Sequence, residues 1–105
     1  MRLILHPNVI LDVQGIMAYY EAVGSRDLAE AFYDELEELL RKAADHPATY
    51  LVRSGDLRRV NLDRFPYNFL YRIVDGTVRV LVVRHHSRDP SFGVRRRWSS
   101  EIEGS

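Results

Sequence analysis

The stretch that decides the fold is Tyr67–Arg84, with the sequence YNFLYRIVDGTVRVLVVR. Two runs rich in β-branched and aromatic residues flank Asp75-Gly76, a pair that favours a tight turn with positive φ at both central positions. The pattern predicts a β-hairpin in which Tyr71 lies opposite Val80. In that register, the core face of the hairpin carries Phe69, Tyr71, Ile73, Val78, Val80 and Val82.

The other face of the predicted hairpin carries Leu70 and Leu81, and it sets Arg72 directly across from Arg79. Like charges opposed on paired strands are destabilising. A neighbouring carboxylate, splayed side chains or a bound polyanion would offset this repulsion. The sequence leaves these three explanations open.

Helical periodicity precedes the hairpin. Residues 8–24 repeat apolar side chains every three to four positions, with Asn8 as a candidate N-cap. A second helix starts at Ser25 or Asp27 in this interpretation and ends near His46-Pro47, because proline disfavours helical geometry in the residue before it. Acidic residues lie opposite the apolar stripe of this second helix.

The remaining elements complete an α+β order. Arg2–His6 is expected to form a first strand and Leu57–Leu62 another, with residues 48–57 irregular between the helices and that strand. The predicted fold is a β-α-α-β-β-β arrangement: an N-terminal strand and an antiparallel two-helix hairpin packed on one face of a small, mainly antiparallel sheet. Residues 1–98 are expected to form a single domain, followed by a disordered tail over residues 99–105.

The composition excludes several classes of protein. With no cysteine among 105 residues, disulfides, thiolate catalysis and cysteine-ligated zinc are absent. No apolar run approaches the roughly 20 residues that span a bilayer, so we expect a cytoplasmic protein without a membrane segment. The formal net charge is zero. That total hides a net charge of −5 over residues 1–50 and +5 over residues 51–105, where every basic residue is arginine.

The densest polar cluster is Arg84–Pro90, at the end of the last strand. Neighbouring side chains on a strand point to opposite faces, so His85 and His86 do not ligate one metal without a bulge. We therefore predict no metal site and no cofactor. One histidine of the pair is either a general acid or base, because its ordinary pKa lies near neutrality, or a structural residue.

Arginines surround this cluster in the sequence. Arg58, Arg59, Arg64, Arg84 and Arg88, with Arg95–Arg97, predict a positive surface along one edge of the sheet. Arginine suits bidentate recognition of phosphate or carboxylate. The surface is expected to bind either a phosphate group or an acidic partner protein.

Several of these stretches together resemble the RelE/ParE toxin superfamily. The resemblance rests on Arg58-Arg59-Val60, the stretch from Phe65-Pro66-Tyr67 to Tyr71-Arg72, the Asp75-Gly76 hairpin and the block Val83–Pro90. It runs from the first strand to Trp98. It implies the toxin half of a bacterial type II toxin–antitoxin module, bound and neutralised by a cognate antitoxin in a hetero-oligomer.

The resemblance implies two alternative activities. ParE-like members block DNA gyrase, and this activity is slightly favoured here. RelE-like members are metal-independent endoribonucleases that cleave messenger RNA on the ribosome. A third alternative is a non-toxic module that only binds the antitoxin.

The nuclease alternative assigns roles to particular residues. His85, His86 and Arg88 would be catalytic, and the anion-binding set would comprise Arg58, Arg59, Arg64, Arg84, Arg72 and Arg79. Many RelE-like nucleases carry a lysine-rich sheet face and a tyrosine near the C-terminus. Here the only lysine is Lys42, on a predicted helix, and the late aromatic residues Phe92 and Trp98 have no hydroxyl. The sequence departs from the nuclease pattern on both counts.

Overall fold

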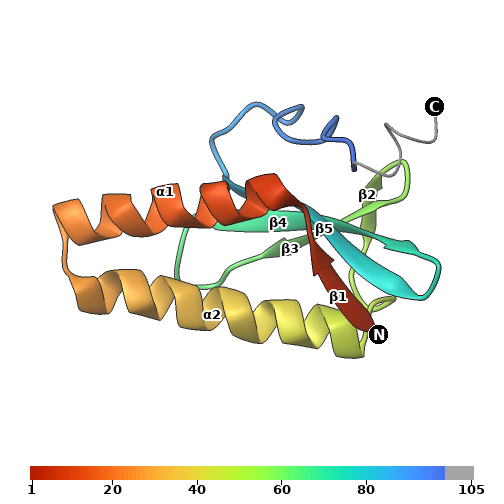
Figure 1. The fold of residues 1–105 in the computed structure, drawn as a ribbon, viewed down its shortest axis with the longest axis horizontal. Helices are drawn as coiled ribbons and strands as arrows, with labels where there is room; N and C mark the ends of the chain where they lie inside the picture. The colour runs from red at the N-terminus through yellow and green to blue at the C-terminus, as the bar shows by residue number, and fades with distance from the viewer. Residues whose placement is uncertain (99–105) are drawn as a thin grey trace.

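A mixed five-stranded sheet in the order β1-β5-β4-β3-β2 forms the centre of the protein (Figure 1). The computed structural model describes residues 1–98, and the tail predicted for residues 99–105 lies outside them. β1 is parallel to β5, and the other neighbouring strands are antiparallel. The strands are β1 (Arg2–Leu5), β2 (Val52–Ser54), β3 (Leu57–Asn61), β4 (Tyr67–Val74) and β5 (Thr77–His85).

The predicted hairpin forms β4 and β5. Asp75 and Gly76 have φ values of 48° and 70°, the pair of positive values that this two-residue turn requires. Tyr71 lies opposite Val80 and Arg72 opposite Arg79, so the predicted register is confirmed next to the turn.

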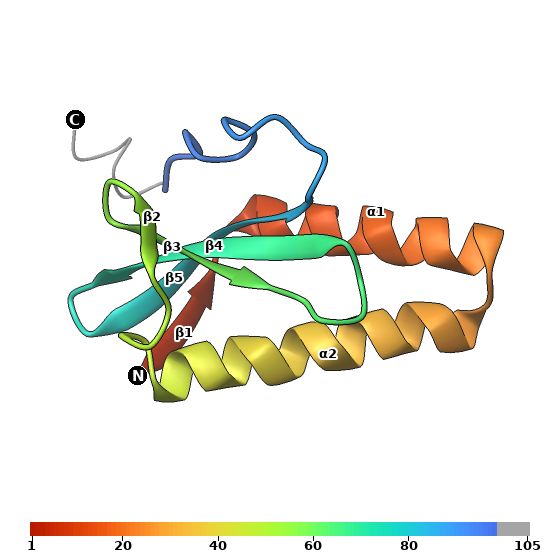
Figure 2. The same cartoon turned by 180° about the vertical axis from the view of Figure 1, so that it is seen from behind.

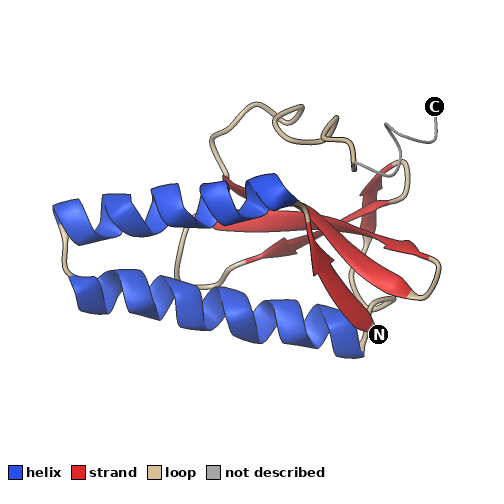
Figure 3. Ribbon diagram, in the orientation of Figure 1, coloured by secondary structure: helices blue, strands red, loops and turns tan. Residues whose placement is uncertain are grey.

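Two antiparallel helices cover one face of the sheet, as the coloured ribbon shows (Figure 3). α1 (Pro7–Val23) begins one residue before the predicted Asn8, and its N-cap is His6, whose Nδ1 accepts a hydrogen bond from the Asn8 backbone at 3.0 Å. The prediction of Asn8 as the N-cap was therefore wrong. The ring nitrogen of His6 accepts a hydrogen bond from a free backbone N–H of the first turn, as an asparagine side-chain oxygen would. α2 (Arg26–Asp45) begins after Ser25, the predicted cap, whose Oγ accepts from the Leu28 backbone.

The helices and the sheet enclose the main core. Phe32, Phe69 and Tyr71 are completely buried there, and the rings of Phe65 and Tyr67 both pack edge-on against Tyr20. Edge-to-face aromatic contacts add stability beyond the apolar area they bury. This core holds the sheet at a fixed position against the helices.

The structure adds one strand to the predicted order. Val52–Ser54, expected to be irregular, pairs with the start of β3 as the edge strand β2. All three residues are exposed, so the stretch lacks the apolar alternation that identifies a half-buried strand.

A β-bulge in β5 changes the second half of the hairpin. Tyr71 pairs with Val80 but Leu70 pairs with Val82, which leaves Leu81 as the extra residue. Val82 was predicted on the core face and lies instead beside Leu70 on the open face, while Val83 joins the main core. Beyond the bulge every side chain of β5 points to the face opposite the one that simple alternation predicts.

Candidate functional site

The open face of the sheet carries a groove rich in arginine. Figure 2, seen from behind, shows this side of the molecule, where the chain after β5 turns back over the strands. The groove begins at a hollow of about 380 Å³. Its lining consists of Arg59, Asn61, Asn68, Arg84, His86, Arg88 and Pro90.

The bulge brings Arg84 into this groove. Beyond Leu81, Arg84 pairs with Asn68 of β4, and Arg59 of β3 lies on the same face across from Leu70. The Arg84 Nη1 donates to the carbonyl oxygens of Pro90 and Phe92 at 2.7 and 2.9 Å. Its guanidinium therefore anchors the loop that follows β5, and burial, reinforced by Arg59, lowers the pKa of Arg84.

His86 is the histidine of the pair that faces the groove. Its Nδ1 lies 2.9 Å from the amide nitrogen of Asn68, a side chain only 3% exposed. Partial desolvation lowers the pKa of His86 below its ordinary value of 6.5, and the positive charges of His85 and Arg59 add to that effect. The imidazole is therefore neutral at physiological pH.

His85 points to the helix side of the same strand. Its ring packs edge-on against Tyr67 at 5.0 Å, and its Nδ1 accepts from the Ser87 backbone at 2.9 Å. It lines a separate hollow of about 400 Å³ between α1 and the end of β5. The two histidines do not converge on one group, as strand alternation predicts.

Arg88 stands between the two hollows and lines both. Its side chain is exposed, and its guanidinium carbon lies 4.6 Å from the centre of the Phe92 ring. Of the predicted site residues, the groove therefore brings together Arg59, Arg84, His86 and Arg88.

The other four arginines of the predicted anion-binding set lie outside this hollow, each with a partner of its own. Arg58 donates to the Tyr50 carbonyl at 2.6 Å, and Arg64 pairs with the Glu35 carboxylate at 3.0 Å. Arg72 and Arg79, which lie opposite each other near the hairpin turn, contact different partners. The carboxylate of Asp56 lies 3.3 Å from Arg72, and Arg79 stacks 5.5 Å from the Trp98 ring. A carboxylate and splayed side chains thus account for that pair without a bound polyanion.

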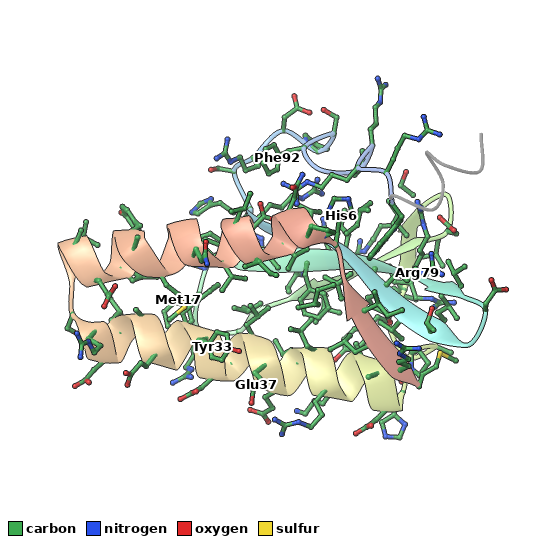
Figure 4. The ribbon with its side chains drawn as sticks, viewed as in Figure 1. His6, Met17, Tyr33, Glu37, Arg79 and Phe92 are labelled. Atoms are coloured by element: carbon green, nitrogen blue, oxygen red, sulfur yellow. The ribbon has the colours of Figure 1, made fainter. Side chains whose placement is uncertain are left out.

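The C-terminal segment of the described chain is fastened over the open face. Phe92 and Val94 cover an apolar cluster of Leu57, Leu70, Leu81 and Val82. Asp12 of α1 holds the segment by a bidentate pair with Arg96, at 2.6 and 2.9 Å. Figure 4 shows Phe92 in this segment and His6 below it, and His6 Nε2 lies 2.9 Å from the Arg97 carbonyl oxygen.

Sequence reasoning missed Asn61, Asn68 and the role of Asp12. A polar Asn68 inside the apolar run of β4 was the available signal, because a buried amide needs partners. Asp12 accepts from the Val83 backbone at 3.0 Å, where β5 extends beyond the end of β1. That contact joins residues 71 positions apart, so no local pattern reveals it.

The groove can bind an oxyanion through its guanidinium groups, and it contains one imidazole, that of His86. Among residues 1–98, no three His, Cys, Asp or Glu side chains lie close enough together to hold a metal ion. Neither helix of the described chain is long and apolar enough to cross a membrane.

Comparisons with known proteins identify the family. The model of the ParE toxin of the type II toxin–antitoxin system parDE matches residues 3–90. A search of curated protein sequences gives no match.

Solved structures share the fold at low sequence identity. The chromosomal ParDE system of P. aeruginosa contains a chain with a TM-score of 0.71 and 17% identity, over 81% of this chain and 95% of that one. Isolated E. coli RelE gives a TM-score of 0.60 and 17% identity, over 85% and 87%. An E. coli RelE double mutant in complex with a peptide of the antitoxin RelBc gives 0.57 and 16%, over 98% and 90%. Because the family model spans most of the sequence, this chain belongs to the ParE toxin family of type II toxin–antitoxin systems.

Proposed function

We propose that this toxin arrests bacterial growth by inhibiting DNA gyrase and does not cleave RNA. The observation that carries the proposal is the separation of the histidine pair, with His86 in the basic groove and His85 against Tyr67 on the other side of β5. Cleavage by a 2′-hydroxyl requires a base and an acid on either side of one phosphate. The groove offers one such group, whereas inhibition by binding requires none.

Membership of the ParE family supports the same conclusion. The hydrogen bonds of Arg84 also support the proposal, because Nη1 of its guanidinium donates to two backbone carbonyls of the loop. A group that anchors a loop is less available to stabilise a phosphate in a transition state.

Two assays run side by side test the proposal. The purified toxin is added to DNA gyrase in a supercoiling assay and to translating ribosomes in an mRNA cleavage assay. We expect supercoiling to be inhibited and the mRNA to stay intact. Normal supercoiling at excess toxin would overturn the proposal. Ribosome-dependent cleavage that is lost in Arg88→Ala and in His85→Ala/His86→Ala would establish the nuclease alternative instead.

An apolar groove between the two helices is the surface we assign to the antitoxin. Its volume is about 280 Å³, and Figure 4 labels Met17 of α1 and Tyr33 and Glu37 of α2 along it. Ile10 and Tyr33 line it while remaining 53% and 42% exposed. An exposed apolar groove of this kind fits the apolar face of a partner segment, and the similar chain from P. aeruginosa belongs to a ParDE system.

Coexpression with the product of a neighbouring small open reading frame tests this assignment. We expect the two proteins to copurify, and Ile10→Glu/Tyr33→Glu to break the complex while the toxin keeps its helical circular dichroism. Val23→Glu is the matched control, because Val23 is 62% exposed on α1 outside the groove. Copurification that survives the double change would contradict the assignment.

A further inference from the structure

The basic groove extends beyond the hollow described above. A second hollow of about 480 Å³ shares Arg59, Arg84 and Pro90 with it and adds Arg53 from β2. The two hollows are therefore neighbours, lined by residues of β2, β3, β4 and β5 and of the segment after β5, and we call them together the channel.

The charges along this channel are all positive. Arg53, Arg59, Arg84 and Arg88 line it, and neither hollow has an aspartate or a glutamate in its lining. Within residues 1–98 none of these four arginines forms a salt bridge, and the buried Nε of Arg59 has no hydrogen-bond partner there.

Within residues 1–98, five arginines outside the channel form ion pairs with carboxylates. The carboxylates of Asp12, Glu35 and Asp56 each hold one of them. Arg59 and Arg84 also repel each other: the pKa of Arg84 is lowered mainly by burial, Arg59 lowers it further, and Asp89 opposes the effect. A carboxylate entering the groove would relieve this repulsion.

The lining favours a peptide over a nucleic acid. Single-stranded nucleic acids are held by aromatic side chains on which the bases stack. Neither hollow is lined by Phe, Tyr or Trp, and the one aromatic ring in the lining is the imidazole of His86, which contacts the amide of Asn68. The nearby Phe92 ring already lies 4.6 and 5.4 Å from the guanidinium carbons of Arg88 and Arg96. The floor is aliphatic instead, made by Leu57, Leu70 and Val94.

We propose that this open-face groove binds an extended acidic segment of the toxin's target protein, with carboxylates on Arg59 and Arg88 and aliphatic side chains over Leu57 and Leu70. The proposal rests on the proposed function, because a toxin that acts without cleaving RNA needs a surface for a protein target. The groove lies on the sheet, away from the apolar groove between the helices, so target and antitoxin use different surfaces.

Fluorescence anisotropy with two labelled probes tests the chemistry of the groove. One probe is an eight-residue peptide of alternating glutamate and leucine, and the other is an oligodeoxythymidylate of the same formal charge. We expect the peptide to bind the full chain more tightly than the oligonucleotide, and Arg59→Gln/Arg88→Gln to weaken it at least tenfold. Arg26→Gln/Arg41→Gln is the matched control, because both side chains are exposed on α2 outside the groove.

Three results of the binding and copurification experiments would overturn the inference. Tighter binding of the oligonucleotide would assign the groove to a nucleic acid. Peptide affinity that rises tenfold in Glu101→Gln/Glu103→Gln would show that the chain's own acidic end occupies it. Loss of antitoxin copurification in Arg59→Gln/Arg88→Gln would assign it to the antitoxin.

The gyrase assay separates failure of this inference from failure of the proposed function. If the wild-type chain inhibits supercoiling and Arg59→Gln/Arg88→Gln inhibits equally, the groove is not the target surface although the proposed function stands. If the wild-type chain does not inhibit supercoiling, the proposed function fails, and the target assignment that rests on it fails too. The expected result is inhibition by the wild-type chain and the Arg26→Gln/Arg41→Gln control, and at least tenfold weaker inhibition by the groove variant.

Discussion

Replacing Asp12 by alanine removes a side chain that hydrogen-bonds both β5 and the C-terminal segment to α1. Its carboxylate receives two hydrogen bonds from Arg96, at 2.6 and 2.9 Å, and one from the Val83 backbone at 3.0 Å. The side chains of Asp12 and Arg96 are only 9% and 14% exposed. The substitution therefore leaves a guanidinium and a backbone N–H in a poorly hydrated place.

The magnitude follows from these two losses. Removing one partner of a buried ion pair costs about 3–5 kcal/mol, and an unsatisfied buried N–H costs about 1–3 kcal/mol. Arg96 keeps its bond to the Leu81 carbonyl and lies in a surface segment that can move toward water. We therefore expect Asp12→Ala to lower the free energy of unfolding by about 3 kcal/mol, below the roughly 4–8 kcal/mol that the two losses would add up to. Asp12→Asn keeps an acceptor oxygen and should lose about half as much.

Urea unfolding followed by far-ultraviolet circular dichroism measures the effect. Glu21→Ala is the control, because Glu21 is half exposed on the same helix and its ion pair with Arg26 is 3.7 Å long; such surface changes stay within about 0.5 kcal/mol. A double-mutant cycle with Arg96→Ala isolates the pair itself. A loss below about 1 kcal/mol in Asp12→Ala would refute the reasoning, because it would mean that the buried pair is solvated in solution.

Three further predictions rest on single contacts. Gly93→Ala is expected to loosen the C-terminal segment, because Gly93 has a φ of 80° and an added Cβ would overlap the Val82 side chain; faster amide exchange in that segment measures it. The NMR titration midpoint of His86 should lie below 6.5 and move upward in Arg59→Gln, since removing that positive charge removes one cause of the lowered pKa; an unchanged midpoint would show that Arg59 does not act on it. Glu35→Gln should cost about 1–3 kcal/mol in urea unfolding, because the buried carboxylate accepts the backbone N–H groups of the loop before β4 and an amide nitrogen in its place accepts none; an unchanged midpoint would contradict this role.

Local signals in the sequence were reliable where one physical constraint decided the outcome. Asp75-Gly76 dictated the hairpin because few pairs accept positive φ twice. Ser25 capped α2 because its hydroxyl reaches a free backbone N–H. The prediction was wrong at the start of α1, where another side chain accepts the capping hydrogen bond. His6 caps α1 in place of Asn8, because its ring nitrogen already faces that backbone.

The site was predicted by residue type and only partly by position. The arginine excess after residue 50 indicated an anion-binding surface, and the structure gathers Arg59, Arg84 and Arg88 with His86 in one groove. Counting charge does not reveal which arginines have partners. Arg64 and Arg96 are held by carboxylates from the helical half of the chain, far away in the sequence.

The sequence by itself determined the order of the elements apart from β2, the hairpin turn and the division between an acidic helical half and an arginine-rich sheet. Those features follow from side-chain period, turn geometry and composition, which are local. Only the tertiary structure decided which face Arg84 and His86 occupy. That choice depends on the single extra residue Leu81, and Leu81 and Val82 stay on one face because the returning segment at Phe92 and Gly93 packs over them. This packing contact joins parts of the chain that meet only in the folded protein. It therefore determines that Arg84 and His86 line the groove.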